Sequence, residues 1–248
     1  MRRLVFWGLL PFALPQAFKM RKTAPRFKAA AGPTGGIVGS GAPLRLLAIG
    51  DSIIAGVGAT TLSKALVGRT AEALAIQLEA EIHWTALGKI GITTDGVIHK
   101  LLPDIPEEIP QFILVSTGVN DVTSLKRTAT WRSELHSLLE KLSSYAPNAL
   151  IAVSGLPPME TFPLLPAPLN KIMGLRAKTF DQEIAQLLRQ FPNTVHVPIA
   201  FDPSDDAFAG DGFHPSETSY AAFGQAMAQA LLLHKTMRSM TRDRNPKA

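Results

Sequence analysis

Five short, mostly apolar runs recur along the chain, and each is followed by a longer stretch whose apolar residues fall at helical spacing. Strands buried on both faces of a sheet lose the polar alternation of a half-exposed strand, and parallel neighbours are joined by crossover helices. The pattern therefore predicts one α/β domain, a three-layer α/β/α sandwich around a five-stranded parallel sheet. The expected strands are residues 44–49, 81–87, 112–117, 149–154 and 194–197, and the expected helices are residues 62–78, 94–102, 130–145, 171–189 and 216–233.

Length and composition are consistent with such a domain. A chain of 248 residues, 46% of them hydrophobic, can bury a sizeable core, so extensive disorder is not expected. The chain has no cysteine, which excludes disulfides, cysteine-ligated zinc, iron–sulfur clusters and thiol catalysis. The missing cysteines do not determine the cellular compartment.

The net charge of +5 comes from the two ends of the chain. Residues 1–28 carry +7 and residues 235–248 carry +4, whereas residues 29–234 carry −6. A basic groove on the domain is therefore not expected, and no basic motif interleaved with aromatic residues is present. The charge pattern predicts no nucleic-acid partner.

The beginning of the chain resembles a membrane-directed segment. Met1 is followed by two arginines, a 15-residue, mostly apolar run (4–18) and five further basic residues before the alanines at 29–31. Basic residues on both sides of the run resist translocation, and 15 residues with two prolines are short for a bilayer of roughly 30 Å. We expect an interfacial or hairpin-like anchor that pairs with anionic headgroups. Packing of this segment on the domain's own apolar surface, and a cleaved signal, are the alternatives.

These features divide the chain into three parts. Residues 1–41 form the basic and apolar N-terminal segment, which ends in a glycine-rich linker at 32–41. Residues 42–234 form the α/β domain, and residues 235–248 a basic, solvated tail. The expected location is a membrane surface reached through residues 1–28, with soluble cytoplasmic and exported forms as alternatives.

In parallel α/β sheets the ligand crevice lies beyond the carboxyl ends of the strands, so the residues after each strand are the candidates for chemistry. Gly-Asp-Ser (50–52) follows the first strand and places the Ser52 hydroxyl at the start of a helix, where local amides are free to donate. Taken alone, a serine at a strand-to-helix turn is more commonly a helix cap.

Three further segments lie at the same edge of the expected sheet. Glycines 88 and 91 follow the second strand and could hold an oxyanion with a backbone amide, and Asn120 follows the third strand. Asp211 and His214 lie three residues apart before the last helix, a spacing that lets the carboxylate orient the imidazole. Each has a structural alternative as a turn, a cap or a surface residue, but together they supply what acyl transfer needs.

The order Gly-Asp-Ser, Gly, Gly-x-Asn-Asp and Asp-x-x-His-Pro resembles the SGNH hydrolases, or GDSL-type esterases and lipases, from about residue 44 to residue 233. The resemblance implies a flavodoxin-like fold in which Ser52 is the nucleophile, His214 the base and Asp211 its orienter. It also implies an oxyanion hole formed by Ser52, Gly91 and Asn120. We prefer Gly91 to the alternative, Gly88, because the residues after Gly91 resemble the family's Gly-Asp-Thr-Thr pattern.

The sequence departs from the family pattern at two positions. Ile53 replaces the leucine that gives the GDSL motif its name, which exchanges one apolar residue for another. Ile92 replaces the usual aspartate after the glycine, and this removes a polar group near the oxyanion hole.

The resemblance predicts a serine esterase acting through an acyl-enzyme on short to medium acyl esters, including lysophospholipids, without a cofactor. The proline-rich segment 156–169 is expected to form a stiff loop over the crevice, with Met159, Phe162 and Leu164 lining a substrate pocket. Packing of this loop on the protein's own surface is the structural alternative. Carbohydrate O-acetyl esters are the polar alternative substrates.

Two other classes of protein are alternatives to a serine esterase: a metal-dependent hydrolase and a non-catalytic binding module. Metal-dependent hydrolysis needs several ligands at successive strand ends, but the six histidines are scattered and only His214 lies in a suitable loop, so no metal is expected. A membrane-tethered binding module on the same fold would have no turnover. The presence of all five expected site residues argues against that module.

Overall fold

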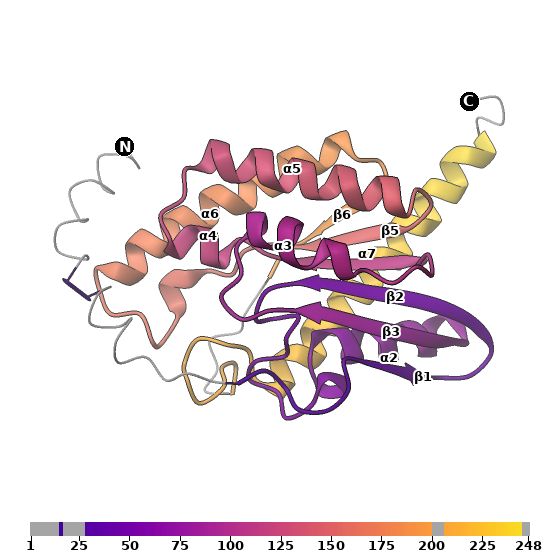
Figure 1. Cartoon of the computed structure of the whole chain (residues 1–248), viewed down its shortest axis with the longest axis horizontal. Coiled ribbons are helices and arrows are strands. Elements are labelled where there is room, and N and C mark those ends of the chain that lie inside the picture. Colours follow the sequence, from indigo (N-terminus) through magenta and orange to yellow (C-terminus); the bar gives the residue numbers. More distant parts are fainter. Residues whose placement is uncertain (1–14, 17–27, 200–205, 245–248) are drawn as a thin grey trace.

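The computed structural model describes residues 15–16, 28–199 and 206–244, the last ten of them by backbone only. Within this part of the chain, six strands form one sheet in the order β1-β3-β2-β4-β5-β6 (Figure 1). All neighbours pair in parallel except β1, which is antiparallel to β3. The strands are β1 (Gly35–Val38), β2 (Ala42–Gly50), β3 (Ala80–Gly88), β4 (Phe112–Ser116), β5 (Leu150–Ser154) and β6 (Thr194–Val197). The expected α/β/α architecture is confirmed, with one strand more than expected.

The additional strand, β1, comes from the stretch 32–41 that the sequence indicated to be a linker. Glycine is depleted in strands, which is why its abundance here suggested a loop. In the structure the Trp84 side chain of β3 lies against β1, and a Cβ atom at Gly36 would come within 2.7 Å of the Trp84 ring. The glycine is needed for this close packing.

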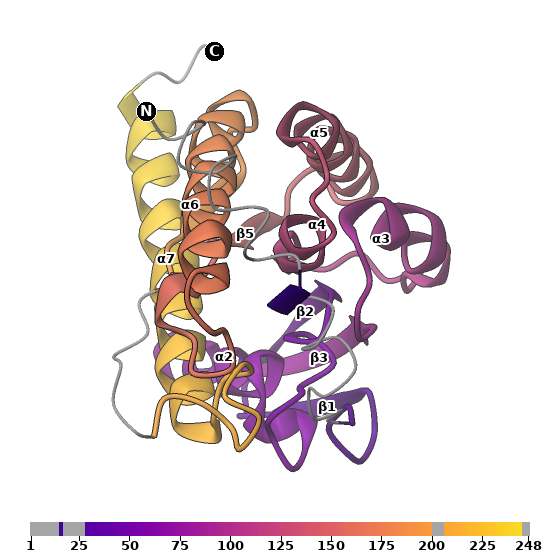
Figure 2. The ribbon, with the colours of Figure 1, turned by 90° about the vertical axis from the view of Figure 1, so that its left-hand side faces the viewer.

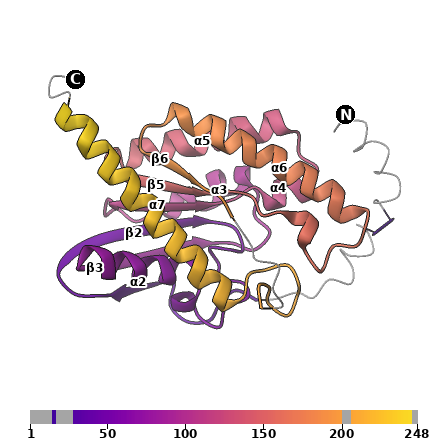
Figure 3. The same ribbon diagram turned by 180° about the vertical axis from the view of Figure 1, so that it is seen from behind.

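Helices cover both faces of the sheet. Helices α2 (Leu66–Leu78) and α7 (Glu217–Arg244) lie side by side on one face, as Figure 3 shows. Helices α3 (Thr94–Lys100), α5 (Thr128–Tyr145) and α6 (Leu169–Leu187) pack on the other face (Figure 2). The short helix α4 (Val119–Thr123) follows β4, and 3₁₀ turns span Leu62–Lys64, Leu102–Asp104, Met159–Thr161 and Leu188–Gln190.

The amphipathic sequence of α5 shows how these layers form. Its apolar residues recur at helical spacing and are buried, and the helix ends two residues before Pro147. Trp131 is fully buried and stacks on Phe180 of α6, with ring centroids 4.3 Å apart. This contact joins α5 and α6 above the sheet.

The expected membrane anchor lies almost wholly outside the described residues. Of residues 1–28, the structure describes Pro15, Gln16 and Lys28. The Gln16 side chain donates to the carbonyl of Ala167 (2.7 Å) and accepts from the N–H of Leu169 (3.3 Å). Among the helices that the structure describes, none combines the length and apolar character required to span a bilayer.

Tyr220 joins α7 to the turn that carries Ser52. Its side chain is fully buried, and its hydroxyl donates to the Val57 carbonyl at 2.7 Å.

Tyr220→Phe should lower the free energy of unfolding by about 1–2 kcal/mol, because the buried carbonyl loses its donor. Urea denaturation measures this change. Tyr145→Phe, which removes a more exposed hydroxyl, is the control, and an equal or smaller loss for Tyr220→Phe would contradict the account.

Candidate active site

Ser52 lies in the turn after β2, at the carboxyl edge of the sheet. The last residue of β2, Gly50, pairs with Ser116 of β4, and the N–H of Asp51 continues the pairing to the Ser116 carbonyl (3.0 Å). A Cβ atom at Gly50 would collide with that carbonyl. The glycine thus permits the close approach of β2 and β4 that places Ser52 at the edge.

The structure brings together Ser52, His214 and Asp211. His214 Nε2 is 3.0 Å from Ser52 Oγ, and His214 Nδ1 is 2.6 Å from Asp211 Oδ2. Asp211 Oδ1 accepts the N–H groups of Phe213 and His214, both at 2.9 Å. The side chains are therefore arranged as the resemblance to the SGNH hydrolases implies.

The environment of Asp211 determines the tautomer of His214. Burial opposes ionisation of Asp211, but hydrogen bonds from the His214 ring and from two backbone N–H groups outweigh it and hold the pKa of the carboxyl below its ordinary value. An ionised carboxylate only accepts, so Nδ1 of a neutral His214 carries the proton. Nε2 is then free to accept the Ser52 proton.

The proline-rich segment braces the loop that carries His214. The N–H of Leu164 donates to the Gly212 carbonyl (3.1 Å), and the Phe162 ring meets the Phe213 ring edge to face at 5.1 Å. Phe213 in turn contacts the His214 ring, with centroids 5.2 Å apart. These contacts hold the loop that carries His214 in place.

The three residues expected to line a substrate pocket differ in their placement. Phe162 lines the pocket beside Ser52. Met159 does not, because its 3₁₀ turn directs the side chain into the core, where it is fully buried. Leu164 is half-buried and contributes its backbone to the His214 loop, and it is not among the residues that line the pocket.

Gly88 and Gly91 have different surroundings. A Cβ atom at Gly88 would collide with the backbone nitrogen of Ala55, so this glycine serves the packing of β3 against the Ser52 turn. Gly91 is exposed in a turn with φ +75, and a Cβ atom there would meet open space. Asn120, in α4, donates through Nδ2 to the Ile92 carbonyl at 2.8 Å. Among the described residues, no hydrogen bond joins Gly91 or Asn120 to Ser52.

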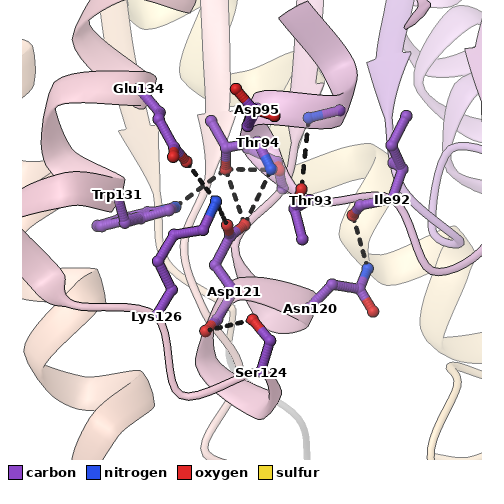
Figure 4. A network of polar contacts seen from close by, with 12 residues as sticks. Ile92, Thr93, Thr94, Asp95, Asn120, Asp121, Ser124, Lys126, Trp131 and Glu134 are labelled. Carbon is purple, nitrogen blue, oxygen red and sulfur yellow. Dashed lines mark hydrogen bonds and ion pairs between the residues drawn. The ribbon is translucent and has the colours of Figure 1, made fainter. Parts of the chain in front are cut away.

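A buried polar network fixes the segment that carries Gly91 (Figure 4). Asp121 Oδ2 accepts the N–H (3.0 Å) and the hydroxyl (2.9 Å) of Thr94 at the start of α3, and Lys126 Nζ is 2.7 Å from Asp121 Oδ1. Trp131 Nε1 donates to the Thr94 hydroxyl at 3.0 Å. The network ties α3, α4 and α5 together. The sequence indicated Asn120 as a site residue but not its buried neighbour Asp121, whose side chain holds this network together.

Ile92, which replaces the family's usual aspartate, packs in the core. Its side chain is 6% exposed and lies in the hydrophobic cluster beneath α3. Only its carbonyl takes part in the polar contacts, by accepting from Asn120. The substitution therefore leaves no unpaired polar group at this position.

A small, partly open pocket of about 30 Å³ lies beside the Ser52–His214 pair. Its apolar lining comes from loops and helices and includes Ile53, Val119, Phe162, Ile199, Phe213 and Phe223. Its sheet side is polar, with Asp51, Ser116 and Ser154 at the ends of β2, β4 and β5. The sequence did not indicate Ser116 and Ser154, because they end apolar strands and belong to no motif.

Asp51 is a buried carboxyl within this pocket. It is 1% exposed, and burial raises its pKa from 3.8 to about 6, against hydrogen bonds to Oδ1 from the Ile53 N–H and the Ser116 hydroxyl. The neutral form of Asp51 is therefore favoured by folding.

The comparisons with known proteins identify the family of the chain. The model of the GDSL-like lipase/acylhydrolase family matches residues 48–222, and the chain belongs to this family of esterases and lipases. The resemblance inferred from the four motifs is thereby confirmed. Among curated proteins, none matches the chain significantly.

Solved structures share the fold. TesA is 19% identical with a TM-score of 0.60, over 77% of this chain and 99% of its own. The psychrotrophic esterase EstA from Pseudoalteromonas sp. is 16% identical (TM-score 0.59; 77% and 98%), and the Clostridium thermocellum family 3 carbohydrate esterase is 17% identical (0.60; 79% and 98%). At these identities the likeness concerns the fold alone.

The histidines outside the site show no ligand arrangement for a metal. Within the described ranges, no three or more His, Asp or Glu side chains gather as a group that could hold an ion. His196, for example, pairs with Asp181 at 2.8 Å, and His83 with Glu81 at 2.6 Å.

Asp51→Asn tests the burial of the Asp51 carboxyl. The variant keeps an oxygen to accept both hydrogen bonds but cannot ionise. Folding raises the pKa of the Asp51 carboxyl from 3.8 to about 6. Below pH 3.8 the carboxyl is neutral in both the folded and the unfolded protein, so its burial costs no ionisation energy. As pH rises from 3.8 through about 6, ionisation favours the unfolded protein and the wild type loses stability. From about pH 3 to about pH 7, its free energy of unfolding should fall by about 3 kcal/mol relative to the variant. Urea denaturation that shows a constant difference would contradict this assignment.

Proposed function

We propose that this protein is a serine esterase that hydrolyses carboxylic esters of short acyl groups through Ser52, His214 and Asp211. The observation that carries the proposal is the continuous hydrogen-bonded series from Ser52 Oγ through His214 to the buried Asp211 carboxylate. In the first step Ser52 Oγ attacks the ester carbonyl while His214 Nε2 takes its proton. His214 returns the proton to the leaving alcohol, and water then hydrolyses the acyl-enzyme with the same base.

Three N–H groups are available for the oxyanion. The backbone N–H groups of Ser52 and Gly91 donate to no acceptor within the described part of the chain. Asn120 uses Nδ2 to bind the Ile92 carbonyl, and an amide nitrogen carries a second hydrogen. These free donors support the assignment of Ser52, Gly91 and Asn120 as the oxyanion hole.

The size of the pocket supports short acyl groups. A volume of about 30 Å³ exceeds the minimum that one water molecule needs, so the pocket has room for a small substrate group. This favours acetyl-sized groups over the longer chains of lysophospholipids. Acetyl esters of carbohydrates fit the same pocket and are the second candidate substrates.

Variants of the three residues test the mechanism. Ser52→Ala and His214→Ala should each lower kcat on p-nitrophenyl acetate by about 10³-fold or more, and Asp211→Asn by about 10⁴-fold, because each removes the nucleophile, the base or its orientation. Urea denaturation serves as the control for folding, and activity should survive a chelator. A fluorophosphonate probe should label the wild type and not Ser52→Ala.

Two results would contradict the mechanism. Near-normal turnover in Ser52→Ala or His214→Ala would exclude these residues from catalysis. A folded wild type that resists the fluorophosphonate would favour the non-catalytic binding module.

Asn120→Ala tests the oxyanion hole. Loss of a donor that acts in the transition state should lower kcat by about 10²–10³-fold with little change in KM. Asn193→Ala is the matched control, because Asn193 also donates to a backbone carbonyl, that of Pro147 (2.6 Å), but precedes β6 at the opposite end of the sheet. Equal effects of the two variants on kcat would contradict the assignment.

A further inference from the structure

The pocket beside Ser52 contains polar side chains that are almost completely buried. Asp51, Ser116 and Ser154 are 1%, 4% and 2% exposed, and all three line the pocket. They follow or end three neighbouring strands, so they lie together on the sheet side of the pocket, facing an apolar wall from loops and helices. The accessible surface of the pocket is mostly apolar, and these side chains contribute a small polar area on its sheet side.

Ser154 has unused hydrogen-bonding capacity. Its backbone pairs with Val197 of β6, but its hydroxyl makes no hydrogen bond with any residue that the structure describes. This hydroxyl is not among the described side-chain atoms that are fully shielded from solvent and unpartnered, so it retains accessible surface where Ser154 lines the pocket and is available to bind a ligand.

Asp51 shows the same pattern. Both hydrogen bonds that its carboxyl accepts, from Ile53 and Ser116, end on Oδ1. Oδ2 receives none from the described residues. The residues that line this pocket of about 30 Å³ therefore include two polar groups without a hydrogen-bond partner among the described residues, the Ser154 hydroxyl and Asp51 Oδ2.

We infer that this pocket is a subsite for a compact substrate group that ends in a hydroxyl, and that Ser154 is its specificity-determining residue. The group has a short carbon chain that packs against the Phe162 and Phe213 rings. Its terminal oxygen lies on the sheet side of the pocket, where it binds Ser154 and Asp51. This inference rests on the proposed esterase function and names the chemistry of one side of the ester. The group is either the acyl or the alcohol part, and the test separates the two.

Two isosteric ester pairs test the subsite. The acyl pair is a butanoate and a 3-hydroxypropanoate of the same alcohol, in which a methyl group is exchanged for a hydroxyl. The alcohol pair is propyl acetate and 2-hydroxyethyl acetate. In the pair whose variable group enters the pocket, kcat/KM should favour the hydroxylated ester by about tenfold or more, because its isostere leaves the buried polar groups unpaired.

Ser154→Ala should reduce that preference to within about twofold, chiefly by lowering kcat/KM for the hydroxylated ester. Ser154→Cys, which is slightly larger and donates only weakly, should give an intermediate ratio and serves as the second variant if the first does not fold. Ser133→Ala, at an exposed position on α5, is the control and should leave the ratio unchanged.

Two outcomes overturn the subsite while leaving the esterase intact. One is a ratio near one in both pairs for the wild type, and the other is an unchanged ratio in Ser154→Ala. If the wild type hydrolyses none of the four esters, nor p-nitrophenyl acetate, the proposed function fails and the subsite fails with it. A preference in one pair that is lost in Ser154→Ala supports the inference and identifies the part of the ester that enters the pocket.

Discussion

The close parallel pairing of β2 with β4, which ends at Gly50 and Ser116, is the constraint on which the site depends. Only a glycine allows the strands to approach as they do at this pair, and the next two residues are the buried Asp51 and Ser52. A slip of the pairing by one residue would turn these side chains to opposite faces. The position of Ser52 and the polar side of the pocket thus both depend on one register.

Loops far apart in the sequence meet at this edge and are braced separately. The loop of Asp211 and His214 is held by Phe162 and by the backbone of Leu164. On the other side, Asp121 holds the start of α3 and α4 through Thr94. Because the two braces share no residue, a change in one should leave the other in place. In the proposed mechanism this separation gives the base and the oxyanion donors independent, rigid support.

The sequence was sufficient to predict the layers of the fold and the family. It also identified Ser52, His214 and Asp211, which the structure joins by hydrogen bonds. Apolar runs and helical spacing reflect burial, and the four motifs reflect the chemistry at strand ends. β1 was missed because the glycines that admit Trp84 also resemble a linker. Met159 was wrongly placed in the pocket, since composition does not show which way a 3₁₀ turn directs a side chain. Ser116 and Ser154 were missed because each is the polar end of a buried strand.

The central claim is that Ser52 attacks an ester carbonyl whose oxygen is held by Ser52, Gly91 and Asn120. A crystal structure of the protein after reaction with the organophosphate paraoxon tests it most directly. The account predicts a phosphorus–Oγ bond at Ser52, with the phosphoryl oxygen within hydrogen-bond distance of the Ser52 and Gly91 N–H groups and of Asn120 Nδ2. An unmodified Ser52, or a phosphoryl oxygen directed away from Gly91 and Asn120, would contradict it.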